Sequence, residues 1–157
     1  MPNNSLPKGG NQLRSTIRKM REEDRTQVIE MMREFYTSPA VLSNGSDEIF
    51  ESDVNACISG SPYLVGYVFE DADKIQGYGM IAKSFSTEFG KPCIWIEDLY
   101  IKDEYRGAGL GSLFLNFIED EYPNSVYRLE VEEENERAVS VYKKSGFEFI
   151  PYMEMKK

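Results

Sequence analysis

The spacing of hydrophobic and polar residues changes several times along this chain, and each change marks an expected helix or strand. Residues 16–19 form the first short strand candidate. Over residues 20–36 apolar side chains recur every three or four positions, with Val28, Met32 and Tyr36 on one face. This period is typical of an amphipathic helix. A strand followed by a helix is therefore expected first.

The middle of the chain carries a second helical pattern and then two strand patterns. Apolar residues at helical spacing predict a helix over residues 49–58, with Ser46 or Asp47 as its N-terminal cap. Residues 63–70 and 74–86 contain many apolar side chains. These patterns predict two strands, joined by a turn at Asp71-Ala72-Asp73.

The second half completes an alternating order of elements. Residues 93–101 are apolar enough for a buried strand, which follows a turn at Gly90-Lys91-Pro92. Apolar residues from Leu110 onward recur at helical spacing. A strand within 125–132, a helix from Glu136 and a closing strand over 147–155 are expected to follow. The predicted order is β-α-α-β-β-β-α-β-α-β.

Composition limits the class of protein. The 157 residues are 41% hydrophobic and 13% aromatic, which is enough for one core, so a single domain over residues 15–157 is expected. Residues 1–14 lack an apolar centre and are interpreted as a mobile leader, not a signal peptide or anchor. No apolar run approaches the roughly 20 residues of a membrane span. Cys57 and Cys93 lack metal-ligand spacing, which favours buried thiols in a cytoplasmic protein.

The connection between the 93–101 strand and the helix from Leu110 is rich in glycine. Gly107, Gly109 and Gly111 follow directly after Arg106. Glycine lets a backbone approach a ligand closely, and the first N–H groups of a helix point outward and attract phosphate. The pattern predicts a cradle for a pyrophosphate group, and a glycine-rich connector without a ligand is the alternative.

Two other phosphate-binding motifs fit this segment less well. A Rossmann dinucleotide site would use Glu130 for a ribose contact, but Ser112 stands where a third glycine or alanine is expected. The chain after Glu132 is also too short for the rest of a doubly wound sheet. A P-loop is excluded because no Gly-Lys-Ser/Thr follows the glycines. A dinucleotide-binding enzyme therefore remains a less favoured alternative.

Two groups of residues in fixed register resemble one family. The first group is Arg106-x-x-Gly109-x-Gly111 at a helix start, preceded by the strand over residues 96–101. The second group is Asn135, Ala138, Tyr142 and Gly146-Phe147. Together they resemble the GNAT superfamily of acetyl-CoA-dependent N-acetyltransferases. The resemblance implies an α/β (α+β) GNAT fold, with a central mixed, splayed β-sheet flanked by helices.

The resemblance also implies that the protein binds acetyl-CoA and uses no metal ion. The expected cofactor-binding residues are Leu99, Tyr100, Ile101, Arg106, Gly107, Ala108, Gly109, Leu110, Gly111, Ser112, Asn135, Ala138 and Tyr142. The backbone of Leu99 and Ile101 would pair with the pantetheine amides, and the Leu99 N–H would polarise the thioester carbonyl. Asn135 would bind the pantetheine arm, cap the helix from Glu136, or do both.

Catalysis must proceed without histidine, because the sequence contains none. An amine that is held close to a thioester attacks it without a protein nucleophile. The resemblance makes Tyr142 the acid for the departing thiolate, since a phenol stays protonated at neutral pH, and core packing is its alternative role. Glu97 is the candidate base. Asp98 competes with it, because a β-bulge would change which carboxylate faces the cleft.

Charge narrows the choice of partners. The net charge of −9 disfavours nucleic acid and favours a cationic acceptor: a small primary amine, a polyamine or a peptide amine. The acidic run over residues 130–136 is either a solvated face or an acceptor funnel. Residues 23–59 and 85–91 are expected to set acceptor choice. The sequence predicts an N-acetyltransferase acting by direct attack in a ternary complex, with a non-catalytic acyl-CoA-binding module as the alternative; the resemblance allows a homodimer.

Overall fold

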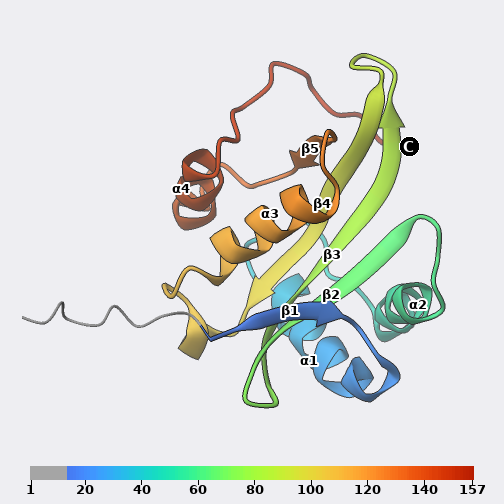
Figure 1. The fold of residues 1–157 in the computed structure, drawn as a ribbon, viewed down its shortest axis with the longest axis vertical. Helices are drawn as coiled ribbons and strands as arrows, with labels where there is room; N and C mark the ends of the chain where they lie inside the picture. Colours follow the sequence, from blue (N-terminus) through green and yellow to red (C-terminus); the bar gives the residue numbers. More distant parts are fainter. Residues whose placement is uncertain (1–13) are drawn as a thin grey trace, which may run out of the picture.

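The computed structural model describes residues 14–157 as a mixed sheet flanked by helices (Figure 1). The expected leader over residues 1–14 therefore lies, apart from Arg14, outside the described residues. The strands are β1 (Thr16–Lys19), β2 (Leu64–Asp71), β3 (Lys74–Ser86), β4 (Lys91–Ile101) and β5 (Val126–Leu129). The helices are α1 (Arg25–Tyr36), α2 (Asp47–Ile58), α3 (Leu110–Glu121) and α4 (Glu136–Lys144), with short 3-10 turns at Glu22–Asp24 and Asp103–Tyr105.

The sheet has the strand order β1-β2-β3-β4-β5, and its last pair differs from the others. The first three pairs are antiparallel, whereas β4 and β5 are parallel. A parallel pair needs a crossover connection, which α3 supplies between the two strands. The prediction of a mixed sheet is confirmed.

The strands β4 and β5 separate halfway along β4. Their pairing runs only from Cys93–Val126 to Ile96–Leu129. Beyond this point β4 continues to Ile101 and stays paired with β3 alone. The outer backbone edge of the β4 end is therefore not covered by β5, and this opening is the predicted splay of the sheet.

A β-bulge lies where the splay begins. Met80 of β3 faces Asp98, while the next residue, Ile81, faces Ile96, so Glu97 has no cross-strand partner. An extra residue of this kind bends a strand and changes the direction of the neighbouring side chains. Ile96 packs in the core cluster under α3, whereas Tyr100 packs in the cluster under α1 and α2.

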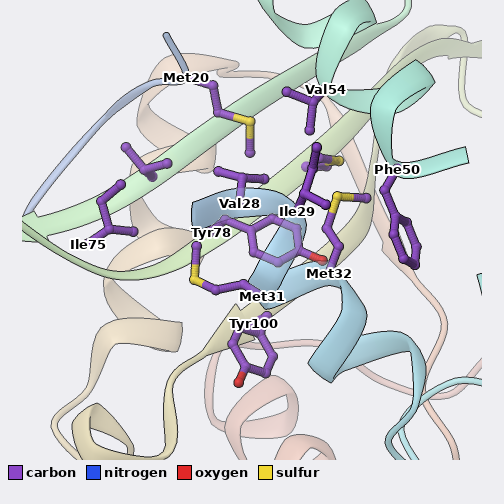
Figure 2. Packing of buried hydrophobic residues seen from close by; sticks show 12 residues of the cluster. Met20, Val28, Ile29, Met31, Met32, Phe50, Val54, Ile75, Tyr78 and Tyr100 are labelled. Carbon is purple, nitrogen blue, oxygen red and sulfur yellow. The ribbon is translucent and has the colours of Figure 1, made fainter. Parts of the chain in front are cut away.

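Two hydrophobic clusters hold the helices on opposite faces of the sheet. One joins α1 and α2 to the sheet through buried residues that include Val28, Met32, Val54 and Tyr78, which are labelled in Figure 2. The other joins α3 to the sheet around Phe114. Within residues 14–157, no helix has both the length and the apolar character that crossing a membrane requires.

The first helix begins later than its apolar pattern predicts. Residues 20–24 are not α-helical, because Asp24 is buried and bound by groups that precede it in the chain. Its carboxylate accepts hydrogen bonds from the Arg21 N–H at 2.8 Å and the Arg18 guanidinium at 2.7 Å. This contact fixes Arg21 in an extended conformation, and α1 starts only at Arg25.

The predicted closing strand over residues 147–155 is wrong. Within this segment no residue is assigned to a strand, and Figure 1 shows it as an irregular chain after α4. Phe149, Tyr152 and Met153 are exposed. The other boundaries hold within a few residues, although β5 is shorter than the predicted 125–132 because its pairing ends at Leu129. Cys93 is buried and Cys57 partly buried, and both are free thiols.

Candidate active site

A cleft of about 790 Å³ lies between the separated end of β4, the start of α3 and the helix α4. It is lined by all the residues predicted from the sequence for cofactor binding or catalysis, with the exception of Ala108. Ala108 is exposed in the same glycine turn but is not part of the cleft wall. The splay, the glycine turn and α4 therefore converge on one site.

The start of α3 presents free backbone N–H groups to this cleft. Gly109 is the N-cap residue with φ of 88°, a left-handed conformation that favours glycine, and no side chain caps the helix. The first helical hydrogen bond is donated by the Leu113 N–H to the Gly109 carbonyl. The N–H groups of Leu110, Gly111 and Ser112 precede that bond and are open, which is the arrangement that binds phosphate.

Two arginines lie beside the glycine turn. Arg106 is held by a hydrogen bond from its Nε to the Ile101 carbonyl at 2.8 Å and by an ion pair with Asp103 at 2.5 Å. Its guanidinium lies 5.6 Å from the centre of the Tyr100 ring. Arg137 of α4 also lines the cleft, and its terminal nitrogen comes within 3.6 Å of the position that a Cβ on Gly107 would take. Arg137 was not among the residues expected at the site, because nothing in its local sequence pattern relates it to the glycine turn.

Asn135 caps α4, one of the two roles expected for it. Its side-chain oxygen accepts a hydrogen bond from the Ala138 N–H at 3.2 Å. The cap fixes the start of α4, from which Ala138, Val141 and Tyr142 face the cleft. The same asparagine also lines the cleft.

Replacing Asn135 by Ala is expected to lower the free energy of unfolding by about 1 kcal/mol, because an N–H group at the start of α4 loses its acceptor. Asn135→Ser is the matched control, since serine is an equally good cap. Urea denaturation of the three proteins measures the difference. Equal stability of the Ala and Ser variants would show that the cap contributes nothing.

Tyr142 lies on α4 with its ring partly buried in the cleft wall. The ring packs edge to face against Phe147, with 6.1 Å between the ring centres. Burial raises the pKa of Tyr142 to about 12. The phenol therefore keeps its proton throughout the neutral and mildly alkaline range and remains a hydrogen-bond donor there.

The two carboxylates of the bulge have different surroundings. Asp98 is only 4% exposed and accepts hydrogen bonds from the Tyr36 hydroxyl at 2.9 Å and the Tyr78 hydroxyl at 2.8 Å. Glu97 is exposed on the strand and lines the cleft. Partial withdrawal of its carboxyl from water, together with the negative charges of Glu154 and Asp53, raises the pKa of Glu97 above its usual range. A carboxylate with a raised pKa is a better proton acceptor near neutral pH.

A second, smaller pocket of about 250 Å³ lies on the other side of the bulge. Glu97 lines both this pocket and the main cleft. The other polar residues of the small pocket are Tyr36, Asp53, Tyr63 and Asp98. Burial raises the pKa of Asp53 on α2. Asp53 was not among the residues expected at the site, because its place in the small pocket depends on how α2 packs beside the bulge.

Residues at the end of α1 line both the main cleft and the small pocket, and residues of the acidic run line the main cleft. Phe35, Ser38 and Pro39 line the main cleft, whereas Tyr36 lines the small pocket. Of the acidic run, Glu130, Glu132 and Glu134 also line the cleft. A hydrogen bond with Glu154 and burial raise the pKa of Glu130 to about 7.

A sheet that opens beside an uncapped helix start, with a carboxylate and a phenol in the same cleft, is the arrangement that the GNAT resemblance led us to expect. The sequence model described as the acetyltransferase (GNAT) family matches residues 26–147. The chain belongs to this family, which uses acetyl-CoA.

Curated relatives agree with the family assignment. The thialysine N-epsilon-acetyltransferase of Sus scrofa is 31% identical over 144 residues, which cover 83% of this chain and 82% of that protein. The enzyme of the same name from Bos taurus is 39% identical over 75 residues, covering 46% of this chain and 44% of that protein. In that second alignment the chain spans less than half the length of its relative.

Solved structures share the fold at low sequence identity. A possible acetyltransferase from Clostridium difficile 630 has a TM-score of 0.75 and 20% identity, covering 91% of this chain and 96% of that one. A predicted acetyltransferase from Clostridium acetobutylicum, solved with acetyl-CoA, has a TM-score of 0.72 and 18% identity. That match covers 90% of this chain and 96% of the other.

Proposed function

We propose that this protein transfers the acetyl group of acetyl-CoA to a cationic primary amine, by direct attack in a ternary complex. The observation that carries the proposal is the position of Glu97, which lines both the large cleft and the small acidic pocket. A base at that junction would meet a cofactor on one side and an amine on the other. Direct transfer requires this proximity of two bound substrates.

The residues of the large cleft fit the parts of acetyl-CoA in order. The open N–H groups at the start of α3, with Arg106 and Arg137, would hold the diphosphate. The uncovered backbone edge of β4 would pair with the pantetheine amides at Leu99 and Ile101. The Leu99 N–H would stabilise negative charge on the thioester oxygen. Acetyl-CoA supplies the acetyl group in an activated form, as a thioester.

Two side chains would carry out the proton transfers. Glu97 accepts a proton from the ammonium group of the acceptor, which frees the nitrogen lone pair for attack on the thioester carbon. A carbon–nitrogen bond forms and the carbon–sulfur bond breaks, and Tyr142 donates its proton to the leaving sulfur. The second proton of the attacking nitrogen restores the phenol through solvent, and Glu97 releases its proton to solvent.

The acceptor is proposed to be a small cationic amine, not a polyanion. Three carboxylates, Asp53, Glu97 and Asp98, line the small pocket, and no basic residue of the described chain lines it. The net charge of −9 also attracts a cationic acceptor and repels a polyanion. The relatives' name, thialysine N-epsilon-acetyltransferase, describes transfer to a side-chain amine in those proteins and supports the same class of acceptor here.

A panel of primary amines, polyamines and peptide amino termini, incubated with acetyl-CoA, tests the proposal. Release of free CoA together with a product one acetyl group heavier is the expected result. Calorimetry with acetyl-CoA and with NAD separates the alternatives. Binding of acetyl-CoA without turnover of any amine would favour the non-catalytic module, and preferential binding of NAD would favour a dinucleotide enzyme.

The diphosphate site gives a prediction that separates binding from folding. Ser112→Glu is expected to weaken CoA binding about tenfold, because the new negative charge repels the diphosphate at the start of α3. The same charge favours the helix dipole, so stability should not fall. Ser112→Gln is the neutral control of similar size. Calorimetric titration with CoA measures both variants, and equal affinity would contradict a diphosphate at this helix start.

A further inference from the structure

The buried carboxylate of Asp98 is held from two sides. The Tyr36 hydroxyl at the end of α1 donates to one oxygen, and the Tyr78 hydroxyl on β3 donates to the other. Tyr78 has no exposed surface, and its ring lies within the core cluster under α1 (Figure 2). Burying a carboxylate costs free energy unless hydrogen bonds replace those lost to water. The two phenol hydroxyls supply these hydrogen bonds to Asp98.

The position of Asp98 in the bulge connects this arrangement to Glu97. Ile96 pairs with Ile81 and packs under α3, while Asp98 pairs with Met80 and its side chain lies on the opposite face. Glu97 lies between them without a cross-strand partner. Its direction therefore depends on the two residues that flank it, and Asp98 is the one fixed by side-chain hydrogen bonds.

We propose that Tyr36, Asp98 and Tyr78 form a clamp that fixes the bulge and so positions Glu97 between the two substrates. This inference rests on the proposed function. Asp98 and Tyr78 are positioning residues in it, because the phenols occupy both oxygens of Asp98, and Tyr78 is out of reach of any substrate. A displacement of about 1 Å at a catalytic group is enough to slow a reaction substantially.

The charge state of the clamp follows from its neighbours. Tyr36 faces Asp98 from α1, Asp53 and Cys57 face it from α2, Tyr78 faces it from β3, and Glu97 adjoins it on β4. Burial raises the pKa of Asp98 to about 6, and the two phenol hydrogen bonds act in the opposite direction. The ionised carboxylate accepts from both phenols. Protonation removes part of that capacity, so the clamp weakens as the pH falls below about 6.

Tyr78→Phe tests the clamp, because it removes one hydroxyl and keeps the ring. The kcat for acetyl transfer is expected to fall roughly tenfold, while KM for acetyl-CoA stays within about twofold of wild type. The rate should rise with pH as both Glu97 and Asp98 ionise, so the loss of a donor that lowers the pKa of Asp98 should also move this acidic limb to higher pH. Tyr36→Phe removes the other donor and should shift the same limb in the same direction, which keeps the test available if one variant folds poorly.

Tyr67→Phe is the matched control. Tyr67 lies on the adjacent strand β2, is equally buried, and loses one hydrogen bond, to the Tyr122 hydroxyl on the α3 side. It should leave kcat and the pH profile unchanged. Wild-type kinetics in Tyr78→Phe, or the same loss in Tyr67→Phe, would overturn the clamp while acetyl transfer by the wild type stands. A wild-type protein that acetylates no amine would instead overturn the proposed function, and the clamp with it.

Discussion

Replacing Tyr142 by Phe is expected to lower kcat about 100-fold and to leave KM for acetyl-CoA within about twofold of wild type. The change removes the hydroxyl that we propose as the proton donor for the leaving sulfur. It keeps the ring that packs on Phe147, so the cleft wall should not collapse. Because the pKa of Tyr142 is raised to about 12, the wild-type rate should also show no loss of this acid up to about pH 9.5.

The measurement is steady-state release of CoA with the best acceptor of the amine panel, compared across pH. Tyr152→Phe is the control, since Tyr152 is 66% exposed and does not line the cleft. A Tyr142→Phe enzyme with wild-type turnover would assign the phenol to packing, the alternative role expected from the sequence. A loss of similar size in Tyr152→Phe would show that the effect is not specific to the site.

Replacing Glu97 by Gln is expected to lower kcat at least 100-fold at neutral pH, because an amide cannot accept the ammonium proton. The raised pKa of Glu97 determines the direction of the expected pH dependence. The base works only when ionised, so the wild-type rate should climb with pH through a limb above the ordinary carboxyl range. That limb should be absent from Glu97→Gln, whose remaining rate follows the fraction of free amine.

Glu133→Gln is the matched control for the base. Glu133 belongs to the acidic run, is exposed, and does not line the cleft, so the same loss of charge should leave kcat unchanged. If the Glu97→Gln enzyme keeps both its rate and its pH limb, the base is another group or water. The buried, doubly hydrogen-bonded Asp98 is the less suitable candidate, because proton transfer to it would disrupt its contacts with two phenols.

Local sequence signals predicted the elements that form the main cleft. The strand ending at Ile101, the glycine turn and the helix from Leu110 are contiguous in sequence, and each has a distinct pattern, so their order and boundaries are confirmed. The cap at Ser46 is confirmed as well, since its side chain accepts from the Ile49 N–H. These features depend on neighbouring residues, and a single sequence contains that information.

Features that depend on tertiary packing were predicted less well. The start of α1 was predicted too early, because the apolar period cannot reveal that Asp24 would be drawn into an ion pair with Arg18. The strand expected over 147–155 has a plausible composition, but composition does not tell whether a neighbouring strand edge is available to it. Asp53 was missed for the same reason, since it reaches the small pocket from α2. Arg137 was missed because nothing in the sequence shows that its side chain reaches the glycine turn from α4.

We propose that the open N–H groups at the start of α3 bind the diphosphate of the cofactor and thereby set the thioester beside Glu97 and Tyr142. A crystal structure of the protein with bound CoA tests it most directly. We expect diphosphate oxygens within hydrogen-bond distance of the backbone nitrogens of Leu110, Gly111 or Ser112, and the sulfur near the Tyr142 hydroxyl. A diphosphate bound elsewhere, or a sulfur outside the cleft between β4 and α4, would contradict it.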